Sequence, residues 1–277
     1  MNVVESLAEL RLARASLSQP VGFVPTMGSL HEGHLSLVRQ ARHDCSSVVV
    51  SIYVNPTQFG PNEDFNNYPR DLQRDLALLR SEGVDLVWTP NDKLMYPTGY
   101  QTWVVVEDVT KTLEGAIRAG HFRGVATVVT KLFNAVQPHK AYFGQKDAQQ
   151  AIVIGTMTRD LDFPIEIVVC PTMREPDGLA MSSRNVYLDS DERSAALVLS
   201  RGLFTAKAAF RAGERDAANL RNIVLDILST EPLVNVQYVS CAHPDTLQEL
   251  EGRVDRALLS LAVTIGKTSL IDNIVLG

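Results

Sequence analysis

The chain has 277 residues, of which 45% are hydrophobic and 21% are charged, and its formal net charge is −6. This balance is typical of a soluble globular protein of about two domains. A mildly acidic chain lacks the dense cationic surface that general nucleic-acid binding requires, so we expect no nucleic-acid partner.

The three cysteines, Cys45, Cys170 and Cys241, lie far apart and form no CxxC pair. This pattern argues against a disulfide framework or a cysteine zinc site and favours buried thiols in a reducing compartment. The first residues show no basic segment followed by an apolar run, and no apolar stretch is long enough to span a bilayer. We therefore expect a cytoplasmic protein without membrane contact.

The first part of the chain alternates predicted strands and helices. Apolar periodicity predicts strands at 21–24, 47–54, 86–88, 102–106, 141–143 and 165–170, and helices at 3–17, 34–42, 70–82, 125–136 and 147–159. Such alternation implies βαβ units, and hence a parallel sheet with helices on both faces. We expect a doubly wound, Rossmann-like α/β domain.

After Pro171 the order of the elements changes. The pattern predicts two helices and then three strands, at 190–211, 216–229, 234–240, 257–265 and 268–275. Helices followed by strands with short links indicate a smaller α+β domain with an antiparallel sheet. We expect domains at 1–173 and 174–277.

The ten residues 25–34, with the sequence PTMGSLHEGH, link the first predicted strand to its helix. In an open α/β sheet, ligands bind at this place. Gly28 permits a tight turn and Gly33 removes side-chain bulk. His31 and His34 share a face once the backbone is helical, and imidazoles beside a helix N-terminus suit a triphosphate. No HExxH motif or cysteine cluster supports a zinc site, so we expect no metal held by the protein alone.

Polar side chains follow two further strands. Asn55 and Gln58 are neutral amides that suit a small hydroxy acid better than a nucleotide, although an Asn-Pro turn with a solvated glutamine is the alternative. In the strand–turn–helix at 143–150, Lys146 can act on phosphates as a point charge. Asp147 can accept hydrogen bonds from sugar hydroxyls or simply cap the helix.

The segment Ser182-Ser183-Arg184 combines two hydroxyls with a guanidinium, which together can surround phosphate oxygens. The preceding Asp-Gly pair at 177–178 predicts a turn, so we expect a movable loop at the domain junction; an ordinary capped loop is the alternative. Asp75, on the predicted helix 70–82, is a possible carboxylate on the magnesium side, but the pattern favours a solvated helix face.

The string HEGH at 31–34 resembles the HIGH motif of class I nucleotidyl transferases, and the whole of 25–34 resembles the pantothenate synthetase family. Further matches are YVNPTQF at 53–59, EDFNNYPR at 63–70, FGQKDAQQ at 143–150, MSSRN at 181–185 and GKTSLIDN at 266–273. Asn66, Gln145 and Ser269 depart from the residues that the family more often has. The resemblance extends from about Val21 to the end.

The resemblance implies that the chain uses ATP to condense pantoate with β-alanine through a pantoyl adenylate, giving pantothenate, AMP and pyrophosphate. It implies that His34 is the catalytic proton donor and that His31, Lys146 and Arg184 act on the phosphates. The implied ATP contacts are Met27, Gly28, Ser29, Leu30, His31, Glu32, Gly33, His34, Gly144, Gln145, Lys146, Asp147, Met173, Met181, Ser182, Ser183 and Arg184.

At the other end of the site, the resemblance implies that Gln58 and Gln150 bind pantoate, with Gln58 also near β-alanine, and Asn55 is a further candidate. Mg²⁺ is expected with ATP, and the assembly is expected to be a homodimer. Three rival functions remain open: a HIGH-motif enzyme that transfers AMP to a phosphate ester, an aminoacyl-tRNA synthetase, and a non-catalytic nucleotide-binding module. The first would need cationic groups for its acceptor, and the second a tRNA surface that the chain does not show.

Overall fold

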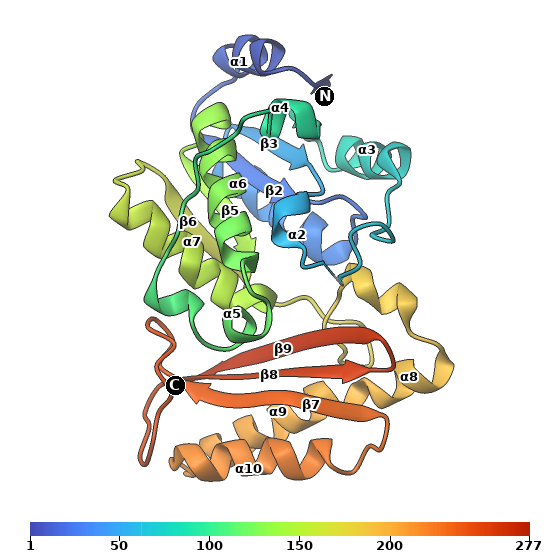
Figure 1. Ribbon diagram of the computed structural model, residues 1–277, viewed down its shortest axis with the longest axis vertical. Coiled ribbons are helices and arrows are strands. Elements are labelled where there is room, and N and C mark those ends of the chain that lie inside the picture. Colours follow the sequence, from blue (N-terminus) through green and yellow to red (C-terminus); the bar gives the residue numbers. More distant parts are fainter. Residues whose placement is uncertain (62) are drawn as a thin grey trace.

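The computed structural model describes residues 1–61 and 63–277, and its first region is built on an open parallel sheet (Figure 1). The strands are β1 (Asn2–Val4), β2 (Val21–Thr26), β3 (Ser47–Ile52), β4 (Leu86–Trp88), β5 (Lys140–Gly144) and β6 (Glu166–Cys170). They lie in the order β1-β4-β3-β2-β5-β6, and every neighbouring pair is parallel.

Helices cover both faces of this sheet because neighbouring strand residues point to opposite sides. The helices are α1 (Leu7–Ala15), α2 (Glu32–Asp44), α3 (Leu72–Ser81), α4 (Asp92–Met95), α5 (Glu114–Ile117), α6 (His121–Val136) and α7 (Ala148–Asp160). Phe23 packs into a core with α1, α6 and α7, whereas Val24 packs with α2 and α3. The prediction of a doubly wound α/β region is confirmed.

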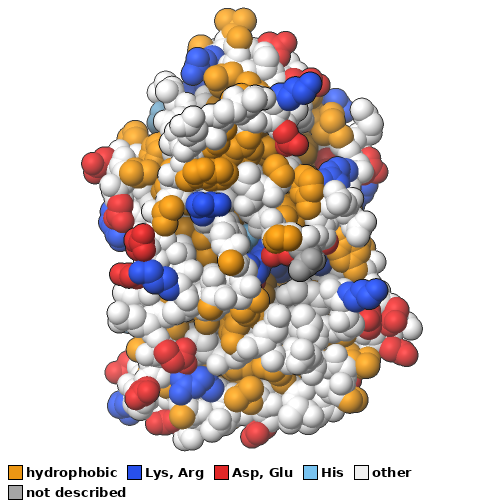
Figure 2. Space-filling model, viewed as in Figure 1, with side chains coloured by type: hydrophobic (Ala, Val, Ile, Leu, Met, Phe, Trp, Pro, Cys, Tyr) orange, Lys and Arg blue, Asp and Glu red, His pale blue; other side chains and the backbone are white. Residues whose placement is uncertain are grey.

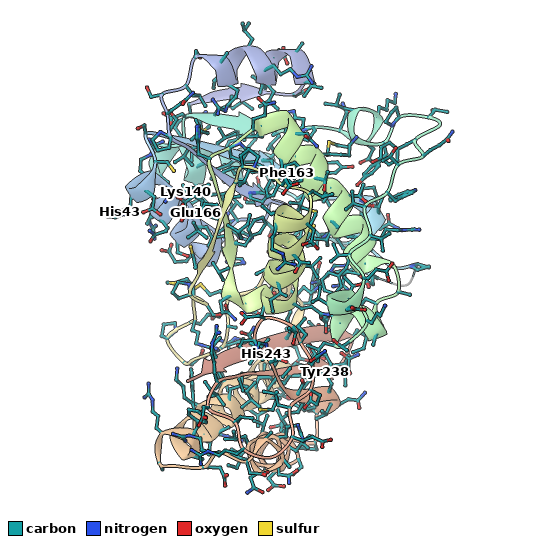
Figure 3. All side chains as sticks on the ribbon, turned by 90° about the vertical axis from the view of Figure 1, so that its left-hand side faces the viewer. His43, Lys140, Phe163, Glu166, Tyr238 and His243 are labelled. Carbon is teal, nitrogen blue, oxygen red and sulfur yellow. The ribbon has the colours of Figure 1, made fainter. Side chains whose placement is uncertain are left out.

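The strand order places a topological switch point in the middle of the sheet. The chain runs outward from β2 through β3 to β4, and then returns to the other side of β2 to add β5 and β6. The connections after β2 and β5 therefore diverge and leave a crevice at the carboxyl ends of these strands. Lys140 and Glu166, whose ion pair joins β5 to β6 at 3.1 Å, mark the opposite end of the sheet (Figure 3).

The second region places one sheet between its own helices and the first region (Figure 1). Its elements are α8 (Ser190–Ala195), α9 (Leu197–Arg211), α10 (Ala217–Leu228), β7 (Val234–Ala242), β8 (Ala257–Ile265) and β9 (Thr268–Leu276). The three strands are antiparallel in the order β7-β8-β9, and the central strand is buried at almost every position. Tyr238 of β7 lines a small space between the regions together with Glu114 (Figure 3). The expected α+β region is confirmed; the division at 173/174 stays a prediction.

The predicted elements differ from the structure in several places. The predicted strand 102–106 is wrong: the segment pairs with no strand among the described residues, and the Val104 N–H donates to Thr127 Oγ1 at 3.0 Å instead. The predicted helix 3–17 begins only at Leu7, because residues 2–4 pair with β4 and Ser6 caps the helix. The predicted helix 190–211 is interrupted at Ala196. Within the part of the chain that the structure describes, no helix could cross a membrane.

Candidate active site

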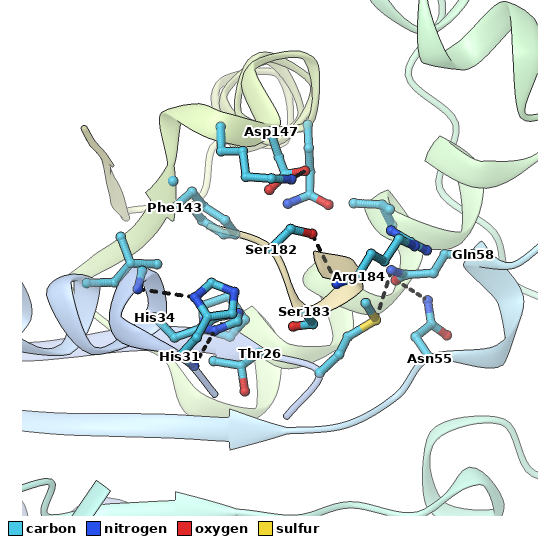
Figure 4. A pocket seen from close by; sticks show the side chains of 18 of the residues that line it. Thr26, His31, His34, Asn55, Gln58, Phe143, Asp147, Ser182, Ser183 and Arg184 are labelled. Atoms are coloured by element: carbon cyan, nitrogen blue, oxygen red, sulfur yellow. Dashed lines mark hydrogen bonds and ion pairs between the residues drawn. The ribbon is translucent and has the colours of Figure 1, made fainter. Parts of the chain in front are cut away.

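A cavity of about 240 Å³ lies at the carboxyl ends of β2 and β5 (Figure 4). It is bounded by the segments that follow β2, β3 and β5, by the start of α6, and by the loop that precedes α8. The predicted site residues in its wall are Met27, His31, Gly33, His34, Asn55, Gln58, Gly144, Lys146, Asp147, Gln150, Met173, Met181, Ser182, Ser183 and Arg184. One space therefore collects residues from five separate parts of the sequence.

The turn between β2 and α2 is shaped by a buried carboxylate. Asp75 of α3, which is 1% exposed, accepts hydrogen bonds from the N–H groups of Ser29 and Leu30, both at 2.8 Å. Gly28 has a φ of +80° there, and a Cβ atom on it would lie 3.0 Å from the Asp75 carboxylate. The prediction of a solvated Asp75 is wrong, because backbone donors of this turn replace water as its partners. Burial raises the pKa of Asp75, and the two N–H groups oppose that shift.

The two histidines of the first motif are neutral hydrogen-bond donors. His31 Nδ1 accepts from the Gly33 N–H at 3.2 Å, and His34 Nδ1 accepts from the His31 N–H at 3.4 Å. Because both Nδ1 atoms accept, the proton of each neutral ring sits on Nε2. Burial lowers the pKa of His31 to about 4 and that of His34 to about 3. Near neutral pH the pair therefore offers two imidazole N–H donors without positive charge.

Gly33 is required by the same arrangement. A Cβ atom at this position would lie 2.9 Å from the ring of His31, so any larger residue would displace the ring that caps α2. The ring centroids of His31 and His34 are 4.1 Å apart, and Figure 4 shows the two imidazoles side by side at one end of the cavity. His31 and His34 thus share a face, as their spacing in the sequence predicts.

The turn between β5 and α7 supplies a cation and a carboxylate. Lys146 Nζ lies 3.6 Å from Asp147 Oδ1, and both residues line the cavity. Burial raises the pKa of Asp147, but the charges of Lys146 and Arg184 outweigh burial and keep it below its usual value. Asp147 makes no side-chain capping bond to α7, so the alternative of a simple helix cap is wrong.

The opposite end of the cavity is formed by uncharged amides. Gln58 is 8% exposed, which excludes the solvated glutamine considered from the sequence. Asn55 Nδ2 donates to Gln58 Oε1 at 3.0 Å, and Gln58 Nε2 donates to Met27 Sδ at 3.1 Å. Gln58 Oε1 thus accepts from Asn55 and one hydrogen of Nε2 is donated to Met27, which leaves the second Nε2 hydrogen for an acceptor in the cavity. Both amide hydrogens of Asn55 are taken by the protein, the second by Gly124 O at 3.2 Å.

The loop before α8 contacts the first motif. Ser183 Oγ donates to Ser29 O at 3.2 Å, and Ser182 Oγ accepts from the Arg184 N–H at 3.2 Å and so caps a short 3-10 turn (Ser183–Tyr187). The Arg184 guanidinium donates to both carboxylate oxygens of Asp64, at 3.1 and 2.9 Å. Residues 182–184 thus form a capped loop, and the same residues carry the hydroxyl and guanidinium groups that suit phosphate oxygens. Their binding of phosphates stays a prediction.

Five predicted ATP contacts do not line the cavity. Gly28 and Ser29 form the turn held by Asp75, and Leu30 is buried in the core at 1% exposure. Glu32 pairs with Arg39 on the surface, and the Gln145 side chain donates to Asn273 Oδ1 at 3.0 Å. The contacts of these residues with ATP stay predictions.

The cavity wall also contains three residues that were not predicted as site residues from the sequence: Arg118, His121 and Tyr68. His121 Nδ1 lies 2.8 Å from Gln58 O, and Arg118 donates to Glu63 at 2.8 and 2.6 Å. Burial lowers the pKa of His121 to about 4. The helix predicted from 125 begins at His121 instead, so this histidine was assigned to a connecting segment. The sequence GHFRG at 120–124 is the signal that could have located His121.

The cavity thus has imidazole and ammonium groups that suit phosphate oxygens at one end, and at the other the amides of Asn55 and Gln58 with His121 and Arg118 next to them. Located at the switch point of a doubly wound sheet, this arrangement defines an α/β enzyme that acts on a nucleotide and a small polar acid. Residues 181–184, in the loop that precedes the helices of the second region, line the same cavity.

The chain belongs to the pantoate-beta-alanine ligase family, whose model matches residues 2–275. It is 59% identical to the pantothenate synthetase of Chloroflexus aurantiacus over 274 residues, covering 99% of this chain and 97% of that protein. It is also 59% identical to the pantothenate synthetase of Herpetosiphon aurantiacus over 278 residues, covering 100% of both. The protein is therefore a ligase for pantoate and β-alanine, and the rival HIGH-motif functions are excluded.

Solved structures agree with this assignment. The pantothenate synthetase of Thermus thermophilus superposes with a TM-score of 0.95 at 48% identity, covering 99% of both chains. The pantoate-beta-alanine ligase of Francisella tularensis, solved in complex with beta-gamma ATP and beta-alanine, gives a TM-score of 0.82 at 37% identity over 99% of this chain and 97% of that one.

Proposed function

We propose that the enzyme makes pantothenate in two steps within the cavity at β2 and β5. The pantoate carboxylate attacks the α-phosphate of ATP and pyrophosphate leaves; the β-alanine amine then attacks the pantoyl adenylate and AMP leaves. The observation that supports this proposal is a single cavity lined both by groups that suit phosphates, among them His31, His34 and Lys146, and by the buried amide of Gln58 (Figure 4). Positioning and charge stabilisation supply most of the catalysis in the first step.

At the phosphate end, His34 is the proposed proton donor, with His31, Lys146 and Arg184 stabilising charge on the phosphates. The negative charge of a bound triphosphate opposes the burial that lowers the pKa of His34, so bound ATP increases the fraction of this ring that carries a second proton to donate. Arg184 is paired with Asp64 in this structure, and the pyrophosphate oxygens take the place of that carboxylate. The further proposed nucleotide contacts are Met27, Gly33, Gly144, Asp147, Met173, Met181, Ser182 and Ser183.

At the amide end, Gln58 and Gln150 are proposed to bind pantoate. The bond from Asn55 fixes the orientation of the Gln58 amide, so that the Nε2 hydrogen not donated to Met27 can face an acceptor such as a hydroxyl or carboxylate. Asn55 then contributes to pantoate binding indirectly, by orienting the Gln58 amide. The amine of β-alanine enters from the side that pyrophosphate has left.

Mg²⁺ is proposed to arrive with ATP, largely hydrated and bound by the phosphates. The buried Asp75 carboxylate is occupied by backbone donors, which leaves Asp147 as the carboxylate nearest to the proposed phosphates. Reducing, cytoplasmic conditions are proposed because Cys45, Cys170 and Cys241 are all unpaired and buried. Charges of both signs are mixed over the face seen in Figure 2, in keeping with small-molecule substrates.

A homodimer is proposed because the extended segment at 101–107 exposes large apolar side chains. Trp103 is 38% and Val105 58% exposed, which is the pattern of a surface that a second copy covers. The division into domains at 1–173 and 174–277 is likewise proposed, on the break between β6 and the first helix of the second region.

The proposed order of steps is tested by pyrophosphate release without β-alanine. Enzyme mixed rapidly with ATP and pantoate is expected to give a burst of pyrophosphate equal to the enzyme concentration, together with bound adenylate. Pyrophosphate that appears only after β-alanine is added would contradict the two-step scheme. ATP alone is the control and is expected to release none.

A further inference from the structure

The last strand of the chain holds the turn that carries Lys146. Asn273 of β9 is 4% exposed, and its Nδ2 atom donates to the carbonyl oxygens of Gln145 and Lys146 at 3.0 and 2.9 Å. Its Oδ1 atom accepts from Gln145 Nε2 at 3.0 Å. All three polar positions of this buried amide are thus used on one short turn, more than 120 residues away in the sequence.

The preceding residue anchors the same strand to the connection that leaves β6. Asp272 is 2% exposed and accepts from both ends of the Arg174 guanidinium, at 2.6 and 2.9 Å. Consecutive strand residues point to opposite sides, so β9 binds the turn on one side and the connection on the other. Arg174 directly follows Met173 in the cavity wall, and the Asp272 carboxylate also accepts from the Asn273 N–H at 2.7 Å.

The turn needs this support because it has little of its own. It is a single 3-10 turn at Gln145–Asp147 without a side-chain cap, and α7 begins directly after it, again without one. The side chain of Lys146 leaves from the residue whose carbonyl Asn273 holds. A displacement of the turn by about 1 Å moves the Lys146 ammonium by a comparable distance, and such misplacement can lower a rate about 10²-fold.

We propose that Asn273 is a positioning residue for adenylation, which acts by holding Lys146 in place against the triphosphate. The second region of the enzyme thereby contributes to the first chemical step through its last strand, although Asn273 itself touches no substrate. This inference rests on the proposed role of Lys146 in the site, and it also gives the closing LIDN string at 270–273 a function.

The test is the single-turnover rate of pantoate adenylation with saturating ATP and pantoate. Asn273→Ala is expected to lower this rate by about 10- to 100-fold, without changing the Kd of pantoate. Ile274→Val is the matched control, because Ile274 lies on the same strand but packs in the core of the second region. It is expected to lower the melting temperature and leave the rate within about 2-fold. An Asn273→Ala enzyme that loses stability as the control does, at an unchanged rate, overturns the inference.

A second set of variants decides whether Asn273 acts through Lys146. If it does, Asn273→Ala introduced into Lys146→Ala slows adenylation by less than about 3-fold, because the group that it positions is already absent. If Asn273→Ala slows adenylation by the same factor in the Lys146→Ala enzyme as in the enzyme with Lys146, the inference is overturned. A normal rate in Lys146→Ala alone overturns the proposed role of Lys146 and this inference with it, whereas an impaired Lys146→Ala beside a normal Asn273→Ala overturns only the inference.

The isosteric Asn273→Asp variant decides the matter if Asn273→Ala does not fold. At pH 8 its ionised carboxylate still accepts from Gln145 but cannot donate to the two carbonyl oxygens. The same loss of rate is expected, and an unchanged rate overturns the inference.

Discussion

The two strand–turn–helix connections that form the phosphate end of the site are held in different ways. The connection after β2 is held mainly from within the first region, by the carboxylate of Asp75 and by histidine side chains that cap its own helix, with one further bond from Ser183. The connection after β5 has no such local support and is held by Asn273, from the second region. The difference shows that similar local geometry can depend on very distant parts of the chain.

This contrast has a physical basis in the residues of each turn. The first turn contains two glycines, which are small enough for its tight path, and two histidines. The ring nitrogens of the histidines accept hydrogen bonds from N–H groups of the same segment. The second contains Lys146 and Asp147, whose charges are directed at the cavity and are therefore not available as caps. Its backbone must find partners elsewhere, which the amide of Asn273 provides.

The largest effect is expected at the first connection. His34→Ala removes a neutral N–H donor and the proposed proton donor, and commonly such a loss lowers a rate by about 10²–10⁴-fold. The rate of pantoate adenylation in the purified enzyme measures it, with circular dichroism as the check of folding. A near-normal adenylation rate in the folded variant would remove His34 from the catalytic residues.

The next effect is that of the support beneath this connection. Asp75→Ala leaves the N–H groups of Ser29 and Leu30 without a partner, which we expect to lower the free energy of unfolding by about 2–4 kcal/mol and to slow adenylation as well. Asp71→Ala, on the same helix, removes only a helix cap and serves as the control for stability alone, at about 1 kcal/mol. Urea unfolding and single-turnover kinetics measure the two effects. Normal adenylation in Asp75→Ala would show that the first turn keeps its shape unaided.

The features set by local contacts could be predicted from the sequence, whereas those set by distant contacts could not. The buried strand Val48-Val49-Val50 and the string at 25–34 are local patterns, so the parallel sheet and the face shared by His31 and His34 were predicted correctly. Asp75 was assigned to solvent because helical spacing does not show which turn packs against a helix. Asn273 could only be matched by resemblance, since its hydrogen bonds join residues that no local pattern connects.

A smaller effect distinguishes two neighbouring glutamines at the second connection. Gln150 lines the cavity, whereas Gln149 is buried and donates to Val109 O and Thr112 O at 2.9 and 2.8 Å. Gln150→Ala is expected to weaken pantoate binding by about 5- to 100-fold, with ATP binding little changed, because a buried substrate group loses its partner. Gln149→Ala is expected to lower stability and leave pantoate affinity unchanged. Calorimetric titration measures both, and equal loss of pantoate affinity would contradict the distinction.

The smallest effect is the pH dependence that the two histidines of the first connection contribute. In the folded protein the pKa values of His31 and His34 are lowered from 6.5 to about 4 and about 3. Below pH 6.5 the unfolded chain therefore binds protons that the folded protein does not, so their contribution to stability is complete above pH 6.5 and is lost as the pH falls towards 4.

Protonation also places a hydrogen on each Nδ1 atom, which then cannot accept the N–H groups that it caps. His31→Gln is expected to reduce the slope of unfolding free energy against pH, between pH 6 and 4.5, by up to about 1 kcal/mol per pH unit. His43→Asn, at the exposed end of the same helix (Figure 3), is the control and is expected to keep the original slope. Urea unfolding at each pH measures the slopes. An identical slope in His31→Gln would mean that acid destabilises the connection after β2 through groups other than His31. The capping of α2 by this histidine would then contribute no pH dependence.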